Sequence, residues 1–340
     1  MKVQPSTVNG TEADQFVPHI SVTIGLLLSL ASVGVFIYFI HHAAESIQAE
    51  NVIAAVSRDL HYAIDRLYPQ SLGKESPETE RDAEHERAPP KQDLPAGFDR
   101  KARPVTAAQS DYLQAVDVDR LLELAKQHDL VLSIEQRPGK FFFKGRDLVR
   151  VWPGAKLDDA LAADVRAALC FGKRRTLVQD IEFAIDQLVE VAVRALSPCI
   201  NDPFTAMNYL DRLGAALCLL AEKTIPSPFR YDDEGRLRVV TDRSSLAGIV
   251  DAAFNQIRQA ARGNTSVTLR LLETITGVAR HTRDPVFREA LGRHAETAHG
   301  DGEHSIHNPL DRADVDQRYR DAIENLQGRS EPSVATKVCE

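Results

Sequence analysis

The sequence has few cysteines and lacks the short motifs of common catalytic and nucleotide-binding sites. Its four cysteines are Cys170, Cys199, Cys218 and Cys339. None belongs to a Cys-x-x-Cys pair, so we expect neither a disulfide framework nor a thiolate cage for a metal. The chain also has no Walker loop, no dinucleotide-binding fingerprint and no Gly-x-Ser-x-Gly motif. We therefore expect no metal and no cofactor.

Positive charge is also in short supply. Lys and Arg number 41 against 49 Asp and Glu, which gives the 340-residue chain a formal net charge of -8. A chain of this charge is unsuited to neutralising nucleic-acid phosphates as its main work, so we expect no nucleic-acid partner. Its length leaves room for about two domains.

One segment near the amino end has no charge at all. Residues 20–40 read ISVTIGLLLSLASVGVFIYFI, without a charged or amide side chain. A helix of this length reaches roughly 31 Å, about the thickness of the hydrocarbon layer of a bilayer. We predict a transmembrane helix over 17–41, preceded by a flank over 1–16. The alternatives are a buried helix of a soluble protein and a secretory signal, which usually have shorter uncharged runs.

The predicted span carries small side chains along one face. Ser21, Gly25, Ser29 and Ser32 recur at helical spacing, and such a series lets membrane helices approach each other closely. We therefore expect two kinds of partner. One is membrane lipid, and the other is a set of further transmembrane helices, either in a homo-oligomer or upstream of this chain.

The charges beside the span favour a cytoplasmic C-terminal part. Lys2 flanks the span on the near side, and Arg58 and Arg66 follow on the far side, so the positive-inside rule points in this direction. Free cysteines in the C-terminal part agree with a reducing compartment. We expect the protein in the inner (plasma) membrane, with its globular part in the cytoplasm.

Two segments separate the span from the globular part. Apolar residues recur at near-helical spacing from Ile47 to Leu67, which predicts an amphipathic juxtamembrane helix over 42–69. A second copy, the bilayer surface or the globular part could cover its apolar stripe. Residues 70–106 are crowded with prolines and with charges of both signs, which predicts a disordered linker.

The remaining chain predicts a mixed globular part. Short alternating runs between turn residues predict a small β-rich module over 107–155. Longer apolar periodicities predict a helical bundle over 156–299, with a hairpin near 228–241 and a disordered tail over 300–340. The fold class is therefore a mainly α membrane protein with one transmembrane helix, an amphipathic juxtamembrane helix and a cytoplasmic α+β domain.

Polar residues mark the starts of three bundle helices. Thr176 and Gln179 have the spacing of a capping box, which predicts a helix over 177–196. Asp202-Pro203 and Asp284-Pro285 each place a capping residue before a proline at the first helical position, which predicts a helix start at both.

A stripe of carboxylates lies on the predicted helix over 177–196. Glu182, Asp186 and Glu190 recur at four-residue intervals and so share one face, and Arg194 follows at the same interval. Carboxylates in a row are typical of cation binding or of acid and base catalysis. No Glu-x-x-His pair accompanies them, and Glu190 and Arg194 have the spacing of an ion pair, which favours a salt-bridged stripe.

Two further segments contain candidate ligand-binding residues. Arg174 and Arg175 precede the predicted helix start, where cations beside free backbone N–H groups suit a phosphate or a lipid head group. A charged loop is the alternative. Asn201, Asp202 and Thr205 lie in a turn bracketed by prolines, in which Asn201 suits a left-handed conformation and Asp202 caps the next helix.

The same turn carries a family resemblance. The stretch SPCINDPFTA, together with FVPHISVTIGLLLSLASVGVFIYFIHHAAESIQ, RTLVQDIEFAIDQLVEVAVRALSP and FNQIRQAARG, resembles a bacterial family of predicted membrane proteins. This family is the domain of unknown function numbered twenty-two fifty-four. The resemblance covers nearly the whole chain apart from the linker and the tail. Members generally carry several membrane helices before the segment matching residues 20–40, so the resemblance implies an N-terminally truncated chain with a cytoplasmic globular part.

We expect a non-enzymatic, membrane-anchored cytoplasmic domain with a binding or regulatory role. One alternative is a membrane-bound hydrolase or transferase that uses Asp180, Glu182 or Asp186. The other is a subunit of a channel or transporter, although no ionisable residue lies within the predicted span.

Overall fold

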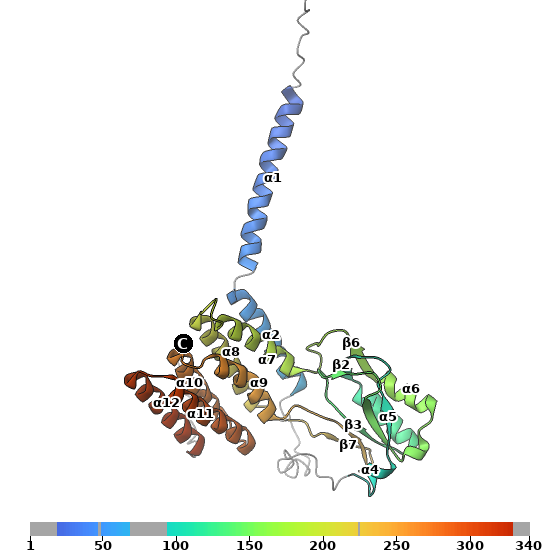
Figure 1. Ribbon diagram of the computed structural model, residues 1–340. Helices are drawn as coiled ribbons and strands as arrows, with labels where there is room; N and C mark the ends of the chain where they lie inside the picture. Colours follow the sequence, from blue (N-terminus) through green and yellow to red (C-terminus); the bar gives the residue numbers. More distant parts are fainter. Residues whose placement is uncertain (1–18, 47–48, 69–93, 224, 329–340) are drawn as a thin grey trace, which may run out of the picture. The chain divides into compact units, whose positions relative to one another are not determined.

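The computed structural model describes residues 19–46, 49–68, 94–223 and 225–328 (Figure 1). The chain divides into two compact units, Met1–Val52 and Ile53–Glu340. The predicted flank over 1–16 lies outside the described residues.

The first unit contains one long helix, α1 (His19–Ser46). Its segment Val22–Ile40 is long and apolar enough to cross a membrane, and no other described helix meets both conditions. The side chains of residues 22–40 are all exposed. The described chain therefore leaves both the apolar surface and the small-residue face at Gly25, Ser29 and Ser32 uncovered.

The predicted juxtamembrane helix corresponds to α2 (Ala49–Leu67), with residues 47–48 and 69 outside the described part. Leu60 and Ile64 are buried in the core of the helical bundle. Polar contacts hold the end of the helix, since Arg66 Nη2 donates to the carbonyls of Leu177 at 2.7 Å and Val178 at 2.5 Å. Of the three predicted occupants of the apolar stripe, the globular part covers the stretch from Val56 to Leu67.

The predicted disordered linker is partly wrong. Residues 70–93 lie outside the described chain, but from residue 94 on the chain is ordered and contains α4 (Phe98–Lys101) and β1 (Arg103–Thr106). Phe98 and Val105 are buried, and β1 pairs with β5. These few contacts order a segment whose composition alone predicts disorder.

The β-rich part consists of two sheets. One has the strand order β1-β5-β3-β8-β7 and the other the order β4-β2-β6. All pairs are antiparallel except β3 with β8. The further strands are β2 (Asp111–Val116), β3 (Val131–Ile134), β4 (Phe141–Phe142), β5 (Asp147–Trp152), β6 (Leu169–Gly172), β7 (Phe229–Tyr231) and β8 (Leu237–Val240). Helices α5 (Val118–His128) and α6 (Asp159–Ala167) and a short 3-10 helix (Gly154–Lys156) complete this module.

The module is larger than the predicted range of 107–155. It also takes in β1, α6, β6 and the β7–β8 hairpin, which the sequence analysis placed in the linker or the bundle. The hairpin itself is confirmed, with Gly235 at a φ of 73° in its turn. The sequence did not predict its place in the sheet, where β8 pairs in parallel with β3 through Leu132 and Val239.

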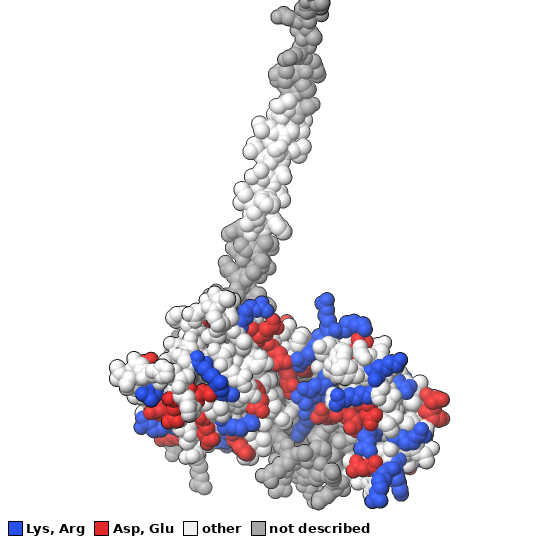
Figure 2. All heavy atoms as spheres, viewed as in Figure 1, with Lys and Arg blue, Asp and Glu red and all other residues white. Residues whose placement is uncertain are grey.

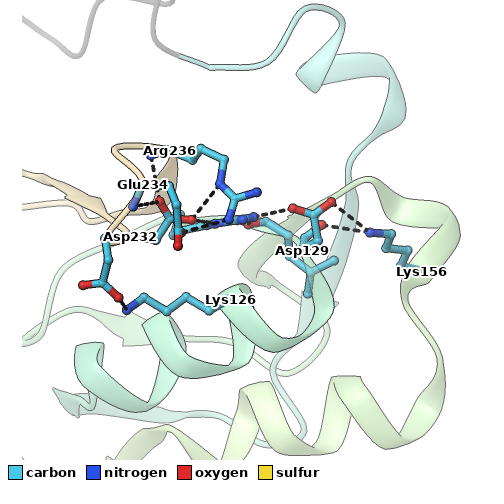
Figure 3. A network of polar contacts seen from close by, with 9 residues as sticks. Lys126, Asp129, Lys156, Asp232, Glu234 and Arg236 are labelled. Atoms are coloured by element: carbon cyan, nitrogen blue, oxygen red, sulfur yellow. Dashed lines mark hydrogen bonds and ion pairs between the residues drawn. The ribbon is translucent and has the colours of Figure 1, made fainter.

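A polar network holds the hairpin against α5 (Figure 3). Asp232 has a fully buried side chain and accepts from Arg238 Nε at 2.8 Å and from Arg236 Nε at 2.9 Å. Arg238 in turn reaches Asp129 just beyond α5, at 2.8 Å. Lys126 lies 2.8 Å from Asp233 in the hairpin turn. The hairpin therefore belongs to the module through side chains as well as through the sheet.

The helical bundle follows the module. Its members are α7 (Ile181–Ala195), α8 (Pro203–Ala221), α9 (Leu246–Ala260), α10 (Thr265–His281), α11 (Pro285–Ser305) and α12 (Pro309–Gln327). Helix α7 packs on α8 and α9, and α10 packs on α8, α11 and α12. Tyr209, Phe254 and Phe287 are the largest fully buried side chains among these helices.

Two of the three predicted helix starts are confirmed. Asp202 caps α8 and Asp284 caps α11, each followed by proline. The capping box is wrong, because α7 begins at Ile181 with Asp180 as its N-cap. Gln179 is engaged elsewhere: its Oε1 accepts from the backbone N–H of Val116 at 2.9 Å, and its Nε2 donates to the Val116 carbonyl at 3.0 Å.

The predicted disordered tail over 300–340 is wrong for residues 300–327. Helix α11 continues to Ser305, and α12 follows with Val315 and Ala322 buried. The end of α12 is also tied down, since Arg288 Nη2 donates to the Asn325 carbonyl at 2.6 Å. Sparse apolar residues at helical spacing are enough here to bury one face of a highly charged helix. Residues 329–340 lie outside the described chain.

Candidate functional site

A cavity of about 210 Å³ lies within the second unit, where the module meets the end of α2 and the start of α7. Its apolar wall includes Val116, Ile134 and Ile181, and three arginines, Arg137, Arg230 and Arg243, provide its positive charge. Ligand sites commonly combine such an apolar wall with a few convergent polar groups. The cavity is therefore the candidate functional site.

Arg137 is held by a carboxylate of the bundle. It follows β3, directly before the turn at Pro138 and Gly139. Its Nη2 lies 2.6 Å from Oε1 and 2.8 Å from Oε2 of Glu182, in the first turn of α7. Its backbone N–H donates to Asp242 at 3.0 Å. Arg137 is thus paired in charge, and it joins the module to the bundle at the cavity.

Arg230 lies in β7 and Arg243 follows β8, and both donate to main-chain oxygens. Arg243 Nη1 donates to the Pro226 carbonyl at 2.6 Å. Arg230 Nη1 donates to the carbonyl of Phe229 at 3.0 Å and also to that of Ser227. Within the described part of the chain, no carboxylate lies in ion-pair distance of Arg230. This side of the cavity therefore suits an incoming anion.

The electrostatics of Arg230 agree with this geometry. Burial lowers the pKa of the Arg230 guanidinium, and the positive charge of Arg243 acts in the same direction, against the attraction of Asp119. Two cations that repel each other in a half-buried site gain from an anion placed beside both. Arg230 keeps its charge at neutral pH, because an arginine starts from a pKa above about 12.

Tyr68 completes the polar wall as a donor. Burial raises the pKa of Tyr68 to about 12, and the nearby carboxylate of Glu182 acts in the same direction. At neutral pH its phenol therefore keeps its proton and has a hydrogen bond to offer to a bound group. It is not suited to act as a base.

The predicted anion site before α7 is occupied by the chain's own carboxylates. Arg175 forms a two-point contact with Asp180, at 2.8 and 3.1 Å, and also lies 2.6 Å from Asp186. Asp180 accepts the backbone N–H of Phe183 at the helix start. The carbonyl of Arg174 accepts from Gln114 at 2.7 Å. A ligand at this position would have to displace these internal contacts.

The carboxylate stripe on α7 is divided among three arginines. Glu182 binds Arg137, and Asp186 binds Arg175. Glu190 binds Arg194 at 2.6 Å, which confirms the ion pair expected from their spacing. Burial raises the pKa of Asp186, although Arg175 opposes this change. No group of three or more metal-binding side chains occurs among the described residues.

The turn with Asn201, Asp202 and Thr205 uses its polar groups locally. Asn201 has a φ of 48°, which confirms the left-handed conformation. Asp202 accepts from the backbone N–H of Thr205 at 3.1 Å and from its hydroxyl at 2.6 Å. These bonds lower the pKa of Asp202. The turn lies at the end of α7 and the cavity at its start, so the structure does not bring the two together.

The sequence analysis missed the residues of the cavity. Tyr68, Arg137, Arg230 and Arg243 come from four separate segments, and none lies in a motif. Arg230 lies in the hairpin that pairs with β3, and Arg243 follows this hairpin. Their convergence depends on the parallel pairing of β3 with β8, for which the sequence contains no local signal.

A comparison with known protein families identifies the family of the chain. The family model described as "Predicted membrane protein (DUF2254)" matches residues 5–277. The chain belongs to this family. The resemblance stated from the INDP turn and its flanking helices is therefore confirmed, and the DUF2254 match covers both the cavity and that turn.

The relatives of this DUF2254 chain include mycobacterial proteins. "Uncharacterized protein Rv1290c" of Mycobacterium tuberculosis and "Uncharacterized protein Mb1321c" of Mycobacterium bovis are each 33% identical to it over 281 residues. That alignment covers 81% of this chain and 51% of each relative, so the chain spans about half the length of the curated relatives it matches. No solved structure matches the chain.

Proposed function

We propose that this DUF2254 chain is a membrane-anchored binding protein whose second unit takes up a small anion with an apolar portion. The site is the cavity lined by Arg137, Arg230 and Arg243. We propose that α1 crosses the inner (plasma) membrane and that the second unit faces the cytoplasm. Binding, rather than catalysis, is the proposed activity.

Anchoring is supported by the family and by α1. The family is one of predicted membrane proteins, and Val22–Ile40 has the length and composition of a membrane span. The cytoplasmic side is supported by the thiols of Cys170 and Cys199, which are free and exposed. Such thiols persist in a reducing compartment.

The observation that carries the ligand class is the pair Arg230 and Arg243. Both guanidinium groups line the cavity, and both donate to main-chain carbonyls of the segment before and within β7. An anionic head placed between them would gain charge-assisted hydrogen bonds. The apolar wall at Val116, Ile134 and Ile181 would cover the rest of the ligand.

The carboxylates of the alternative enzyme hypothesis are used for structure. Asp180 and Asp186 share Arg175, and Glu182 binds Arg137. A general base needs a carboxylate within reach of a substrate proton. None of these three lines the cavity, so binding is the function that the geometry supports best.

Thermal unfolding of the full chain in lipid nanodiscs tests the proposal, with Trp152 fluorescence as the reporter. Phenyl phosphate and inorganic phosphate serve as probes, because they share the anionic head and differ in the apolar portion. We expect a saturable rise in Tm with phenyl phosphate and a smaller rise with inorganic phosphate. A ligand at 100 times its Kd stabilises the folded state by about 2.7 kcal/mol.

The double variant Arg230→Met, Arg243→Met is expected to weaken phenyl phosphate binding at least tenfold. Arg283 and Arg320 are exposed and lie outside the cavity, so Arg283→Met, Arg320→Met is the matched control with the same loss of charge. Equal binding by both double variants would contradict the proposed site. Arg230 and Arg243 would then serve only to stabilise the hairpin.

A further inference from the structure

The turn between α7 and α8 exposes two large apolar side chains. Ile200 is 54% exposed and Phe204 is 74% exposed, although both belong to the stretch that carries the family resemblance. In Figure 2 the bundle shows white, uncharged surface around its upper end. Exposed apolar groups that lie together commonly mark a contact surface.

The turn holds these side chains in a fixed position. Asn201 takes the left-handed conformation, and its N–H donates to the Ser197 carbonyl at 2.8 Å. The N–H of Asp202 donates to the Ala195 carbonyl, also at 2.8 Å. Because both carboxylate oxygens of Asp202 accept from Thr205, the carboxylate is directed to its own helix. The turn therefore presents Ile200 and Phe204 as an apolar tip.

The apolar tip lies at the end of the bundle where the second unit's part of α2 begins. The last turn of α2 contacts the segment before α7 through Arg66, and Asp65 lies 2.6 Å from Lys223, which follows α8. Since α7 and α8 are joined by a short turn and pack on each other, these contacts place the end of α2 at the end of the bundle opposite this turn, and Val56, Leu60 and Ile64 pack along the bundle core from there. The part of α2 that belongs to the second unit, from Ile53 on, therefore starts at the end of the bundle that carries the α7–α8 turn (Figure 1).

The chain length limits how far this end can be from a membrane that α1 crosses. Helix α1 ends at Ser46, and the second unit begins at Ile53. The connection between these two residues spans at most about 25 Å, even when fully extended. This limit holds for any arrangement of the two units.

We infer that the apolar tip, Ile200 and Phe204, docks into the interfacial layer of the bilayer that α1 crosses. The inference rests on the anchoring part of the proposed function and is independent of the ligand. Apolar and aromatic side chains gain free energy at this layer, and the backbone groups of the turn already have internal partners. Docking would orient the second unit by two points, the start of α2 and the apolar tip.

Quenching by brominated lipids tests the inference in the full chain. The variant Phe204→Trp is reconstituted into phosphatidylcholine vesicles whose acyl chains carry bromine, and in parallel into unbrominated vesicles. Leu310→Trp is the matched control, because Leu310 is 76% exposed at the first turn of α12. The unsubstituted chain measures the background from Trp152.

We expect the Phe204→Trp chain to lose at least twice the fraction of fluorescence that the Leu310→Trp chain loses. Ile200→Trp is expected to behave like Phe204→Trp. An unchanged Tm in each variant shows that the substitution has not disturbed the fold. Equal quenching of Phe204→Trp and Leu310→Trp would overturn the inference. Blue-shifted Phe204→Trp emission that grows with the ratio of protein to lipid, without bromine quenching, would also overturn it in favour of contact between two copies.

Flotation of the same vesicles separates the two claims. A chain that floats but shows no selective quenching leaves the anchor in place and removes the docking. A chain that remains at the bottom of the gradient overturns the anchoring and the docking together. Loss of phenyl phosphate binding alone bears on the cavity and on neither of them.

Discussion

Arg137 Nη2 lies 2.6 and 2.8 Å from the two carboxylate oxygens of Glu182, and this contact joins the β-rich module to the first turn of α7. The Arg137 side chain keeps 23% of its surface exposed and that of Glu182 keeps 11%. A pair this far removed from water is costly to break, because the remaining charge stays partly buried without its partner. Arg137 also lines the cavity.

The substitution Glu182→Gln is therefore expected to lower the free energy of unfolding by about 2 to 3 kcal/mol. This loss is smaller than that for breaking a fully buried ion pair, because Arg137 is partly exposed. Urea unfolding of the full chain in nanodiscs, followed by Trp152 fluorescence, measures the change. Glu190→Gln is the matched control on the same helix face, since Glu190 and Arg194 are both largely exposed. The control is expected to change the same quantity by less than about 1 kcal/mol. Similar losses in both variants would mean that the Glu182 contact does not join the two parts.

The substitution Asp202→Ala separates architecture from ligand binding. It removes the N-cap of α8, which costs about 1 kcal/mol of stability, and the Tm of the full chain measures this loss. Because the turn lies away from the cavity, the affinity for phenyl phosphate is expected to stay within about twofold. An unchanged Tm together with weakened binding would instead place a ligand at Asn201 and Asp202.

The helix starts and the hairpin could be predicted because their signals are local. Asp202-Pro203 and Asp284-Pro285 each combine a side-chain acceptor with a residue that needs no N–H, and Asp233 to Gly235 form a turn within a few residues. The sequence does not indicate Asp180 as the cap, because Thr176 and Gln179 have the spacing of a capping box and predict an earlier helix start. The competing contact of Gln179 with Val116 joins residues 63 positions apart, and nothing near Gln179 in the sequence indicates it.

The cavity and the last helix could not be predicted for related reasons. The cavity depends on β8 lying beside β3, and the paired residues are more than about one hundred positions apart. From the sequence alone, any of several strands could have paired with β3. Helix α12 buries Val315 and Ala322 among many charges, so its mean composition resembles that of a disordered tail. Composition averages over both faces of a helix, whereas burial needs only one face.

Ionisation of Tyr68 is expected to weaken the fold at high pH. Burial raises the pKa of Tyr68 to about 12, whereas an exposed tyrosine has a pKa of about 10. Between these values the unfolded chain loses the phenol proton and the folded chain keeps it, so stability falls as the pH rises through this window. The full contribution is about 2 to 3 kcal/mol.

The variant Tyr68→Phe is therefore expected to show a shallower loss of unfolding free energy between about pH 10 and pH 12 than the unsubstituted chain. Urea unfolding at a series of pH values measures this slope. Tyr62→Phe is the control, because Tyr62 lies on α2, which ends just before Tyr68, and is 69% exposed. Parallel slopes for all three chains would show that Tyr68 ionises as an exposed residue does.

Protonation of Asp232 at low pH is expected to weaken the attachment of the hairpin. Burial alone would raise its pKa, but hydrogen bonds from the Arg236 backbone and the Arg238 side chain outweigh this and hold the pKa of Asp232 below its usual range. Its contribution to stability is present above the unfolded pKa of about 4 and is lost as the pH falls towards the lower folded value. The variant Asp232→Asn should lower stability at neutral pH and flatten the change between pH 5 and pH 2.

The same substitution should also weaken phenyl phosphate binding, because Arg230 lies in the hairpin that Asp232 holds in place and Arg243 follows it (Figure 3). Asp314→Asn, at an exposed position of α12, is the control for the loss of one negative charge. Unfolding curves from pH 2 to pH 7 and binding at pH 7 measure the two effects. If Asp232→Asn and Asp314→Asn gave the same acid profile and the same affinity, the hairpin would be held by the β3–β8 pairing alone, and the cavity would not depend on the network around Asp232.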